Sequence, residues 1–568
     1  MLRKFRLSDK LSNKNSIYLW LFLLTWLLIN FFQSAFTELA HDEAYYWMYS
    51  RYLDWGYFDH PPVIALLIRL GYFLLPDEFG VRLLTSVMGT ATIYIIYLLI
   101  DEEKRSLGLF VLLCFSIILV QSHVGGFLAI PDVPVVFFSA LFLLIYKRYL
   151  KKDSYFLAIL LGITGIAMLM SKYHGILILV FSLFAYLNII HRRSFWIIPV
   201  VIILGMLPHL MWQIHHGFPS LKYHLLSRSS SYRFEHTFNY LYSQLLIAGP
   251  LVSILVLYAG FTYKAENLFE KTLKYNMIGI FVFFFLSSFK GHVEAHWTAL
   301  AFIPLMVLAN NRIRNSKIMK KWVSWLFVPS ILLISFVRFA AIVQIFPGTV
   351  LAANELHNWP KWAHQIDSLS EGRKVVFTNS FQRPAKFSFY THGKFATTLN
   401  NIYYRKNQYD IWDFEDSLQH QKVLLVQSRT PQGTIKTAVG ESYHYQMVDD
   451  FMSYNNLKIT ANFDRIETYP DTKFTFIIKL LNTRNDSVIF KKESYIISMF
   501  HDGHKLIQRQ ILFKLDNTKL GPSGDIAIPL VIKSPIVPGK YKMLVSIITS
   551  NLDPGFNSPA FTLVVKNN

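Results

Sequence analysis

Charge and cysteine are both scarce in this chain. Only 16% of its 568 residues are charged, whereas 53% are hydrophobic, and its mean hydropathy is +0.32. This composition excludes an ordinary soluble protein. The only cysteine, Cys114, lies in an apolar run. Without a second cysteine the chain forms no internal disulfide, and cysteine chemistry is not expected.

Acidic residues are fewer than basic ones. The chain has 36 Asp and Glu against 56 Lys and Arg, which gives a net charge of +20. No basic patch carries interleaved aromatic residues, so we reject nucleic-acid binding as a function. We detect no solenoid-type repeat. HVEAHW, at 292–297, lacks the HExxH order of a zinc site.

Long apolar runs are the main feature that the chain does have. They fill most of the first 345 positions, in blocks long enough to cross about 30 Å of hydrocarbon. The pattern predicts a polytopic α-helical membrane protein with about eleven transmembrane helices. The expected spans are 17–36, 79–100, 107–122, 132–147, 155–170, 174–190, 196–214, 241–262, 274–289, 297–311 and 323–346. A further run at 61–75 follows two prolines and contains Arg69, so we predict an interfacial helix there.

The distribution of Lys and Arg predicts the orientation. Most of these residues fall in alternate segments, which the positive-inside rule places in the cytoplasm. The segments are 1–16, 101–106, 147–154, 191–195, 263–275 and 312–322. The first span follows Arg3, Lys4 and Arg6 and lacks a small-residue cleavage site, which predicts a retained anchor. An odd number of spans then predicts a multi-pass inner-membrane protein with a periplasmic C-terminal region.

Two modules are expected after the membrane domain. The predicted domains are 1–346, 347–452 and 453–568. In the second, buried-strand patterns at 373–378 and 422–427 flank a helical candidate at 382–391, which predicts a small α/β module. From about residue 455 onward, short alternating runs separated by turn residues predict an antiparallel, immunoglobulin-like β-sandwich. We find no catalytic motif in the sandwich.

The segment 38–62 differs from an ordinary connection between spans. It lies in the predicted periplasmic loop 37–78 and holds five carboxylates and eight aromatic side chains. The carboxylates are Glu38, Asp42, Glu43, Asp54 and Asp59. An acidic pair flanked by aromatic residues at the bilayer surface suits a site that activates a hydroxyl beside a lipid-borne sugar.

Asp42 and Glu43 are the leading catalytic candidates. A glycosyl transfer needs a base that takes the acceptor proton as the sugar carbon is attacked, and a carboxylate can serve. Alternatively, Asp42 only caps a helix that starts at Glu43. Tyr45 and Tyr46 are candidates for stacking on sugar faces, although an aromatic belt at the membrane interface explains most such residues.

Asp132 is the third catalytic candidate. It stands in LAIPDVPVVFF, at the outer end of an expected span. A carboxylate so close to hydrocarbon is costly and suggests a function. The alternative is again a helix cap.

Basic residues gather on the same predicted face. Those at the ends of spans lie in MSKYHG and HVEAHW, and with one acidic neighbour they are Lys172, His174, His292, Glu294 and His296. The loop 215–240 adds His215, His216, Lys222, His224, Arg228, Arg233 and His236. Such a surface fits binding of a phosphate or another anionic group, and Lys172 is a candidate phosphate ligand. Any single histidine there is more simply explained as a solvated interfacial residue.

The motifs follow one another in an order that resembles a known family. The order is an Asp-Glu pair after the first span, then YFDHPP, FGVR, PDVP, SKYHG and KGHVEAHW. It resembles the bacterial branch of the GT-C-type polyprenyl-phosphate-sugar glycosyltransferases. These include protein O-mannosyltransferases and the transferase that adds aminoarabinose to lipid A. The resemblance covers roughly residues 15–345 and, more loosely, the α/β stretch ending in QYDIW.

The resemblance implies roles for particular residues. Asp42 would be the catalytic base, and Glu43 would support it. YFDHPP resembles a segment in which a lysine contacts the donor phosphate and an acid lies at a metal site, and here His60 and Asp59 hold those positions. Arg233 in YRFEH matches an Arg-Phe pair that faces the donor phosphate. A divalent metal at Asp59 is therefore allowed, and no other cofactor is implied.

Together these features predict an integral-membrane glycosyltransferase. It would move a sugar from a polyprenyl-phosphate carrier in the membrane lipid to a protein, lipid A or another envelope glycan at the periplasmic face. A transporter or flippase of a lipid-linked saccharide is the alternative, and a scaffold whose sandwich binds envelope partners is a third hypothesis. Transporters tend to have repeated halves and ionisable groups near mid-membrane. Here no repeat is detected, and the ionisable groups cluster at one interface.

Overall fold

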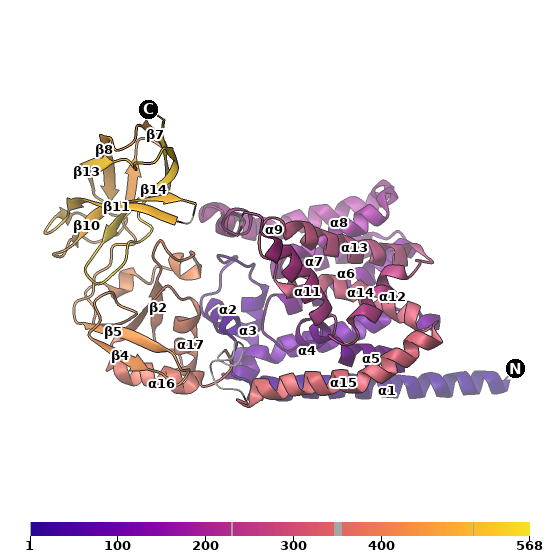
Figure 1. Ribbon diagram of the computed structural model, residues 1–568. Helices are drawn as coiled ribbons and strands as arrows, with labels where there is room; N and C mark the ends of the chain where they lie inside the picture. Colours follow the sequence, from indigo (N-terminus) through magenta and orange to yellow (C-terminus); the bar gives the residue numbers. More distant parts are fainter. Residues whose placement is uncertain (1, 229–230, 346–354, 504, 568) are drawn as a thin grey trace. The chain divides into compact units, whose positions relative to one another are not determined.

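The chain divides into two compact units (Figure 1). The structure is a computed structural model that describes residues 2–228, 231–345, 355–503 and 505–567. The first unit, Met1–His357, is helical, and the second, Asn358–Asn568, contains an α/β part and a β part. The predicted domain boundary between residues 346 and 347 lies outside the described residues.

The first unit consists of α-helices joined by short turns. They are α1 (Leu2–Phe36), α2 (His41–Arg51), α3 (Val63–Leu74), α4 (Glu78–Leu99), α5 (Leu107–Ser116), α6 (Asp132–Lys151), α7 (Tyr155–Ser171), α8 (Ile176–Ala185), α9 (Ile197–His215), α10 (Pro219–Lys222), α11 (Phe234–Ile247), α12 (Ser253–Thr262), α13 (Leu268–Ser287), α14 (Ala299–Ile313) and α15 (Lys317–Ile342). α14 lies at the core, because all of its residues except Arg312 are buried. It packs against α4, α6, α12 and α13.

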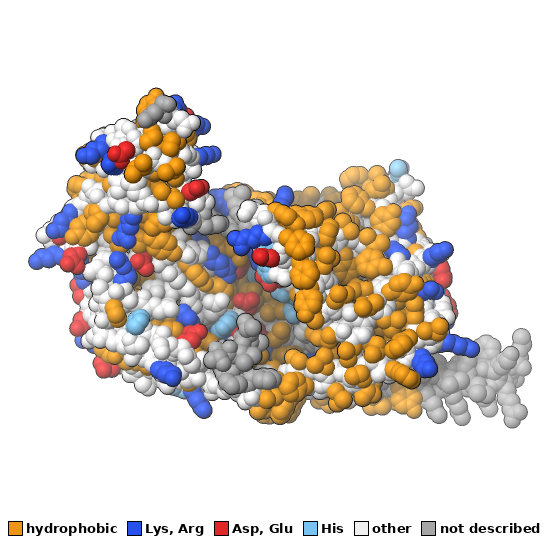
Figure 2. Space-filling view, in the orientation of Figure 1, with side chains coloured by type: hydrophobic (Ala, Val, Ile, Leu, Met, Phe, Trp, Pro, Cys, Tyr) orange, Lys and Arg blue, Asp and Glu red, His pale blue; other side chains and the backbone are white. Residues whose placement is uncertain are grey.

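The outer helices of this unit expose apolar side chains. On α9 and α15 these include Ile203, Leu204, Trp325 and Leu332, each more than half exposed. Figure 2 shows hydrophobic side chains over most of the visible face of the helical unit. So much exposed apolar surface is typical of contact with lipid. The predicted polytopic helical membrane fold is confirmed.

Five described helices are long and apolar enough to span a membrane. Their spanning segments are Ser16–Phe36, Glu78–Leu99, Asp132–Lys151, Arg193–His215 and Lys317–Ile342. They correspond to five of the eleven expected spans. Most of the others are shorter helices, and the apolar run predicted as an interfacial helix is α3, which begins directly after Pro62.

One expected span, 241–262, is not a single helix. It contains the end of α11 and all of α12, with a break between Ile247 and Ser253. Gly249 has a φ of +97°, which an L side chain rarely adopts, and a Cβ there would lie 2.3 Å from the Ser116 carbonyl oxygen. The following Pro250 lacks the N–H that a continuing helix requires. The apolar composition was therefore a poor guide to helix length here.

The first part of the second unit is an α/β sheet. Its elements are α16 (Trp359–Ser370), β1 (Lys374–Thr378), α17 (Gln382–Tyr390), β2 (Ala396–Leu399), β3 (Val423–Val426), β4 (Gly433–Lys436) and β5 (Ser442–Val448). The strand order is β2-β1-β3-β5-β4. β1 pairs in parallel with β2 and β3, whereas β5 is antiparallel to β3 and β4. β1, β3 and α17 match the two strands and the helix expected from the sequence.

The second part is a β-sandwich around its own apolar core. Its strands are β6 (Lys458–Ala461), β7 (Arg465–Thr468), β8 (Lys473–Leu481), β9 (Val488–Ile489), β10 (Tyr495–Asp502), β11 (Lys505–Lys514), β12 (Lys519–Leu520), β13 (Asp525–Lys533), β14 (Gly539–Ile548) and β15 (Phe561–Val565). The main sheets have the orders β11-β10-β14-β15-β7 and β13-β8-β6. The prediction of an antiparallel sandwich is wrong at one pair, because β15 and β7 are parallel.

The two parts of the second unit are joined by buried polar contacts. Ser453 donates its hydroxyl to the Glu415 carboxylate at 2.6 Å, and Arg484 of the sandwich donates to the Ser453 carbonyl at 3.0 Å. The Ile402 N–H also bonds to the Pro554 carbonyl. The predicted boundary near residue 452 therefore falls inside one compact unit.

Candidate active site

Asp42 lies in the first turn of α2. The helix begins at His41 and Ala40 holds the N-cap position, so Asp42 does not cap a helix that starts at Glu43. The Asp42 side chain is exposed, whereas the eight residues from Glu43 to Ser50 are buried. The site thus presents one accessible carboxylate at the positive end of a short, well-buried helix.

Glu43 is held in a fully buried ion pair with Arg82 of α4. The Arg82 Nη2 and Nε atoms lie 2.5 and 2.7 Å from the two Glu43 carboxylate oxygens. The N–H groups of Ala40 and Ala129 also donate to this carboxylate, at 2.9 and 2.8 Å. Arg82 in turn donates to the carbonyls of Ser34 and Thr37. These contacts join the end of α1, α2, α4 and the segment before α6.

The protonation of Glu43 follows from this environment. Burial by itself raises the pKa of the Glu43 carboxyl, but Arg82 and the two backbone N–H groups outweigh it and hold the pKa below its ordinary value. Glu43 is therefore an anion without access to solvent. Its contacts suit positioning of the adjacent Asp42 rather than transfer of a proton.

Asp132 forms the second buried ion pair. It is the first residue of α6, and the Lys172 Nζ atom lies 2.8 Å from each of its carboxylate oxygens. The His296 Nε2 atom is 3.9 Å from the same carboxylate, and the His296 ring stacks on that of His123 at 5.0 Å. Lys172, a predicted phosphate ligand, is thus already engaged by a carboxylate and has one N–H donor left for a further partner.

Asp59 and His60 lie in the buried part of the first loop. The Tyr49 hydroxyl donates to Asp59 at 2.5 Å, and the His60 ring lies between those of Tyr46 and His224. Burial lowers the pKa of His60 to about 4, so this side chain is neutral near pH 7. A neutral imidazole is a weak ligand for a phosphate dianion. Among the described residues no group of three His, Cys, Asp or Glu side chains could hold a metal ion, so Asp59 gains no partner ligands.

The pKa of Tyr46 reflects its burial and the charges of three nearby carboxylates. Its pKa is raised first by burial and then by the negative charges of Asp42, Asp59 and Asp132. Three carboxylates from separate segments of the chain therefore act electrostatically on one phenol. Tyr45 and Tyr46 are only 1% and 5% exposed and pack against Tyr49. Most of their ring surface is part of the core and is not open for stacking on a sugar.

The loop after α2 is hydrogen-bonded to side chains near the end of α9. The Trp212 indole donates to the Asp54 carboxylate at 2.6 Å, and the His209 ring bonds to the Trp55 carbonyl at 2.7 Å. Gly56 faces the same indole, and a Cβ on it would approach to 2.5 Å. Asp54 therefore has a structural role, because it joins this loop to α9.

The segment HVEAHW meets the loop before α11. Arg228 donates to Glu294 at 3.1 Å and lies 4.5 Å above the Trp297 ring, while His292 is 3.4 Å from Glu294. His174 packs its ring against Trp297. The predicted substrate-binding residues His174, His292 and Glu294 thus come together with Arg228, whereas His296 lies beside Asp132 and His123. Arg233, the predicted phosphate ligand at the N-cap of α11, is exposed.

Sequence reasoning did not assign a role to Arg82, His123 or Arg338. In the sequence, Arg82 appeared only as the last residue of the FGVR motif. Arg338, in α15, donates to Asn30 of α1 and to the Gln121 carbonyl, and both Arg82 and Arg338 lie over the Phe127 ring. The signal that would have found them is an arginine in or next to a long apolar run, which is costly in lipid unless it has partners.

Comparisons with known proteins show which proteins this chain is similar to. The family model described as dolichyl-phosphate-mannose-protein mannosyltransferase matches residues 59–212. The lipid A galacturonosyltransferase RgtD of Rhizobium johnstonii is 24% identical over 301 residues, which cover 48% of this chain. The match spans 60% of the length of that relative.

Solved structures show the same fold. ArnT from Cupriavidus metallidurans in the apo state has a TM-score of 0.55 at 12% identity and covers 76% of this chain and 98% of its own. ArnT bound to undecaprenyl phosphate has a TM-score of 0.54 at 13% identity, with 75% and 98% covered. The resemblance to GT-C-type glycosyltransferases that the sequence motifs indicated is confirmed.

Proposed function

We propose that this protein is a glycosyltransferase that uses a polyprenyl-phosphate sugar as donor at the periplasmic face of the inner membrane. The family match and RgtD are both named as glycosyltransferases, and ArnT has been solved with undecaprenyl phosphate. The observation that carries the proposal is the exposed Asp42 next to the buried Glu43–Arg82 pair. The buried pair fixes the start of α2, and the Asp42 carboxylate is exposed to solvent beside it.

The reaction needs few groups from the protein. An acceptor hydroxyl attacks the anomeric carbon of the sugar, and Asp42 takes the hydroxyl proton as the new C–O bond forms. The bond from the anomeric carbon to the phosphate oxygen breaks, and its electron pair leaves with the polyprenyl phosphate. Cations must stabilise the charge that develops on that phosphate.

The structure supports an order of preference among the predicted phosphate ligands. Arg233 is exposed and always charged, so it is the first candidate. Lys172 can contribute only while paired with Asp132. His60 is buried and neutral near pH 7, so we assign it to packing between Tyr46 and His224.

The acceptor is an envelope molecule with a free hydroxyl, and lipid A is the first to test. RgtD is named for lipid A, whereas the matching family model is named for proteins. Protein and other glycan acceptors are therefore the next candidates. The second unit would bind or position this acceptor.

The test compares envelopes and purified enzyme from wild type and Asp42→Asn. This change keeps the size of the side chain and removes its basicity, so sugar transfer should fall by about 100-fold or more. Glu235→Gln is a matched control, because Glu235 is also an exposed carboxylate in the first turn of a helix. Mass spectrometry of lipid A, glycoproteins and glycans measures transfer. Wild-type turnover by Asp42→Asn would refute the assignment of the base, and unchanged envelopes in cells lacking the protein would refute the transferase.

A further inference from the structure

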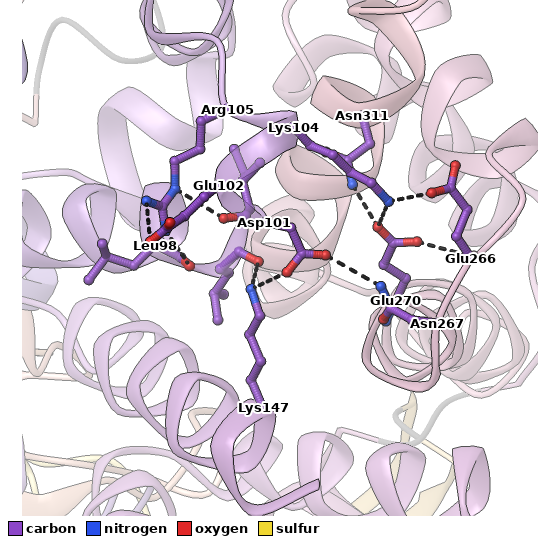
Figure 3. A network of polar contacts seen from close by, with 12 residues as sticks. Leu98, Asp101, Glu102, Lys104, Arg105, Lys147, Glu266, Asn267, Glu270 and Asn311 are labelled. Atoms are coloured by element: carbon purple, nitrogen blue, oxygen red, sulfur yellow. Dashed lines mark hydrogen bonds and ion pairs between the residues drawn. The ribbon is translucent and has the colours of Figure 1, made fainter. Parts of the chain in front are cut away.

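α4 and α6 end at a second cluster of charged residues. Both helices begin at the candidate active site, where Arg82 and Asp132 lie. With 22 and 20 residues, they are about 30 Å long at 1.5 Å per residue. Their C-terminal ends therefore lie on the opposite side of the hydrocarbon from the site. Figure 3 shows the charged residues that gather at these ends.

A cavity of about 290 Å³ lies between the ends of the two helices. It is lined by Leu98, Glu102, Arg105, Leu144, Lys147, Arg148 and Lys151. The lining thus contains four basic side chains and one carboxylate. The volume corresponds to roughly ten water molecules, which is room for a phosphodiester and its neighbouring atoms.

Two of the cations hold the end of α4 in place. Arg105 donates to the carbonyls of Leu98 and Ile100, and Lys147 donates to the Leu99 carbonyl and pairs with Asp101 at 2.8 Å. These carbonyls have no partner inside the helix, and basic side chains are a common way to satisfy them. Arg105 and Lys147 therefore build the wall of the cavity.

The other two cations are available to a ligand. Arg148 and Lys151 are exposed and lie three residues apart, on one face of the last turn of α6. Within the part of the chain that the structure describes, no ion pair joins either of them to a carboxylate. Leu98 and Leu144 add an apolar wall below the two charges. A charged rim above an apolar wall suits a headgroup whose acyl chains remain in the bilayer, whereas a soluble anion would not use the leucines.

We propose that this cavity binds the phosphate headgroup of an anionic phospholipid at the membrane face opposite the candidate active site. Arg148 and Lys151 contact the phosphate, and the leucines contact the first carbons of the acyl chains. The inference is independent of the proposed transferase activity, because none of the lining residues lies at the Asp42 site.

Native mass spectrometry of the full-length protein tests the proposal. The protein is supplied with phosphatidylglycerol or with zwitterionic phosphatidylcholine, and retained lipid is counted. The double variant Arg148→Gln/Lys151→Gln should retain less phosphatidylglycerol, on the order of fivefold for each charge removed. Lys152→Gln is the matched control, since Lys152 follows α6 directly and does not line the cavity. The charge-preserving Arg148→Lys/Lys151→Arg variant should bind like wild type, which separates loss of charge from loss of folding.

Three results would overturn the proposal. One is equal retention of phosphatidylglycerol by the Gln double variant and Lys152→Gln. Another is equal retention of phosphatidylcholine and phosphatidylglycerol by wild type. The third is displacement of phosphatidylglycerol from wild type by excess inorganic phosphate, which would assign the cavity to a soluble anion.

Discussion

The two ends of α4 and α6 carry ion pairs of different kinds. At the candidate active site, Glu43–Arg82 is fully buried, and Asp132–Lys172 is no more than 7% exposed. At the opposite end, Lys147–Asp101 is 13% and 21% exposed, so water reaches it. Buried pairs are costly to break, because one charge is left without a partner or water. Water-exposed pairs contribute little. The difference indicates that breaking an ion pair costs more stability at the site end than breaking Lys147–Asp101 at the other end.

Arg82→Met should have the largest effect on stability. It leaves the Glu43 carboxylate buried without its cation, which costs about 3–5 kcal/mol. The double variant Glu43→Gln/Arg82→Met removes both charges and should recover part of this loss. Thermal unfolding of the purified proteins measures both. If the single and double variants are equally stable, the pair does not determine the stability of the site.

His60 makes the stability of the folded protein depend on pH. Its pKa is about 4 in the folded protein, below the ordinary value of 6.5, so the unfolded chain binds more protons between these values. Its contribution to stability is complete above pH 6.5 and is lost as the pH falls toward 4, by at most about 3 kcal/mol. His60→Gln should therefore flatten the dependence of the unfolding temperature on pH in this window. A pH profile parallel to that of wild type would contradict the burial of a neutral imidazole.

Arg233→Gln should affect the donor more than the acceptor. A charge-assisted contact to phosphate is worth about 1.5–3 kcal/mol, or roughly 10- to 100-fold in donor affinity. Because Arg233 is exposed, stability should not change. Titration with polyprenyl phosphate measures the affinity. Lys222→Gln, which changes an exposed cation at the end of α10, is the control. Equal donor affinity in the two variants would place the phosphate elsewhere.

Asp101→Asn should have the smallest effect. Its partner Lys147 keeps the Leu99 carbonyl as an acceptor, and the pair is partly exposed. The expected loss of stability is about 1 kcal/mol or less, with sugar transfer unchanged. A loss as large as that of Arg82→Met would show that the two ends are equally rigid.

The sequence predicted the class of fold, and it indicated candidate site residues without the partners that the structure places beside them. The sequence indicated Asp132 as a candidate because an ionisable residue next to an apolar run is costly in the membrane. The sequence did not show that Asp132 pairs with Lys172, because Lys172 lies 40 residues away and was predicted to be a phosphate ligand. Glu43 and Arg82 are separated by 39 residues. No local pattern specifies such a pair, because it is formed by tertiary packing.

The break in the expected span 241–262 could have been predicted from the local sequence. The apolar run 241–262 contains Gly249 and Pro250, which together mark a break, yet its hydropathy predicted one span. In the sandwich, β11 has the sequence KLIQRQILFK and lies at the edge of the five-stranded sheet. Its mixture of charged and apolar residues suits an edge strand, where charge discourages pairing with another chain.

The parallel pairing of β15 with β7 has a consequence for how the chain folds. β15 lies between β14 and β7 in the sheet, and Thr562 pairs with Arg465 almost a hundred residues earlier. Contacts so far apart in sequence form late, because the intervening loop must close first. The five-stranded sheet therefore cannot close until β15 has been synthesised and has reached β7.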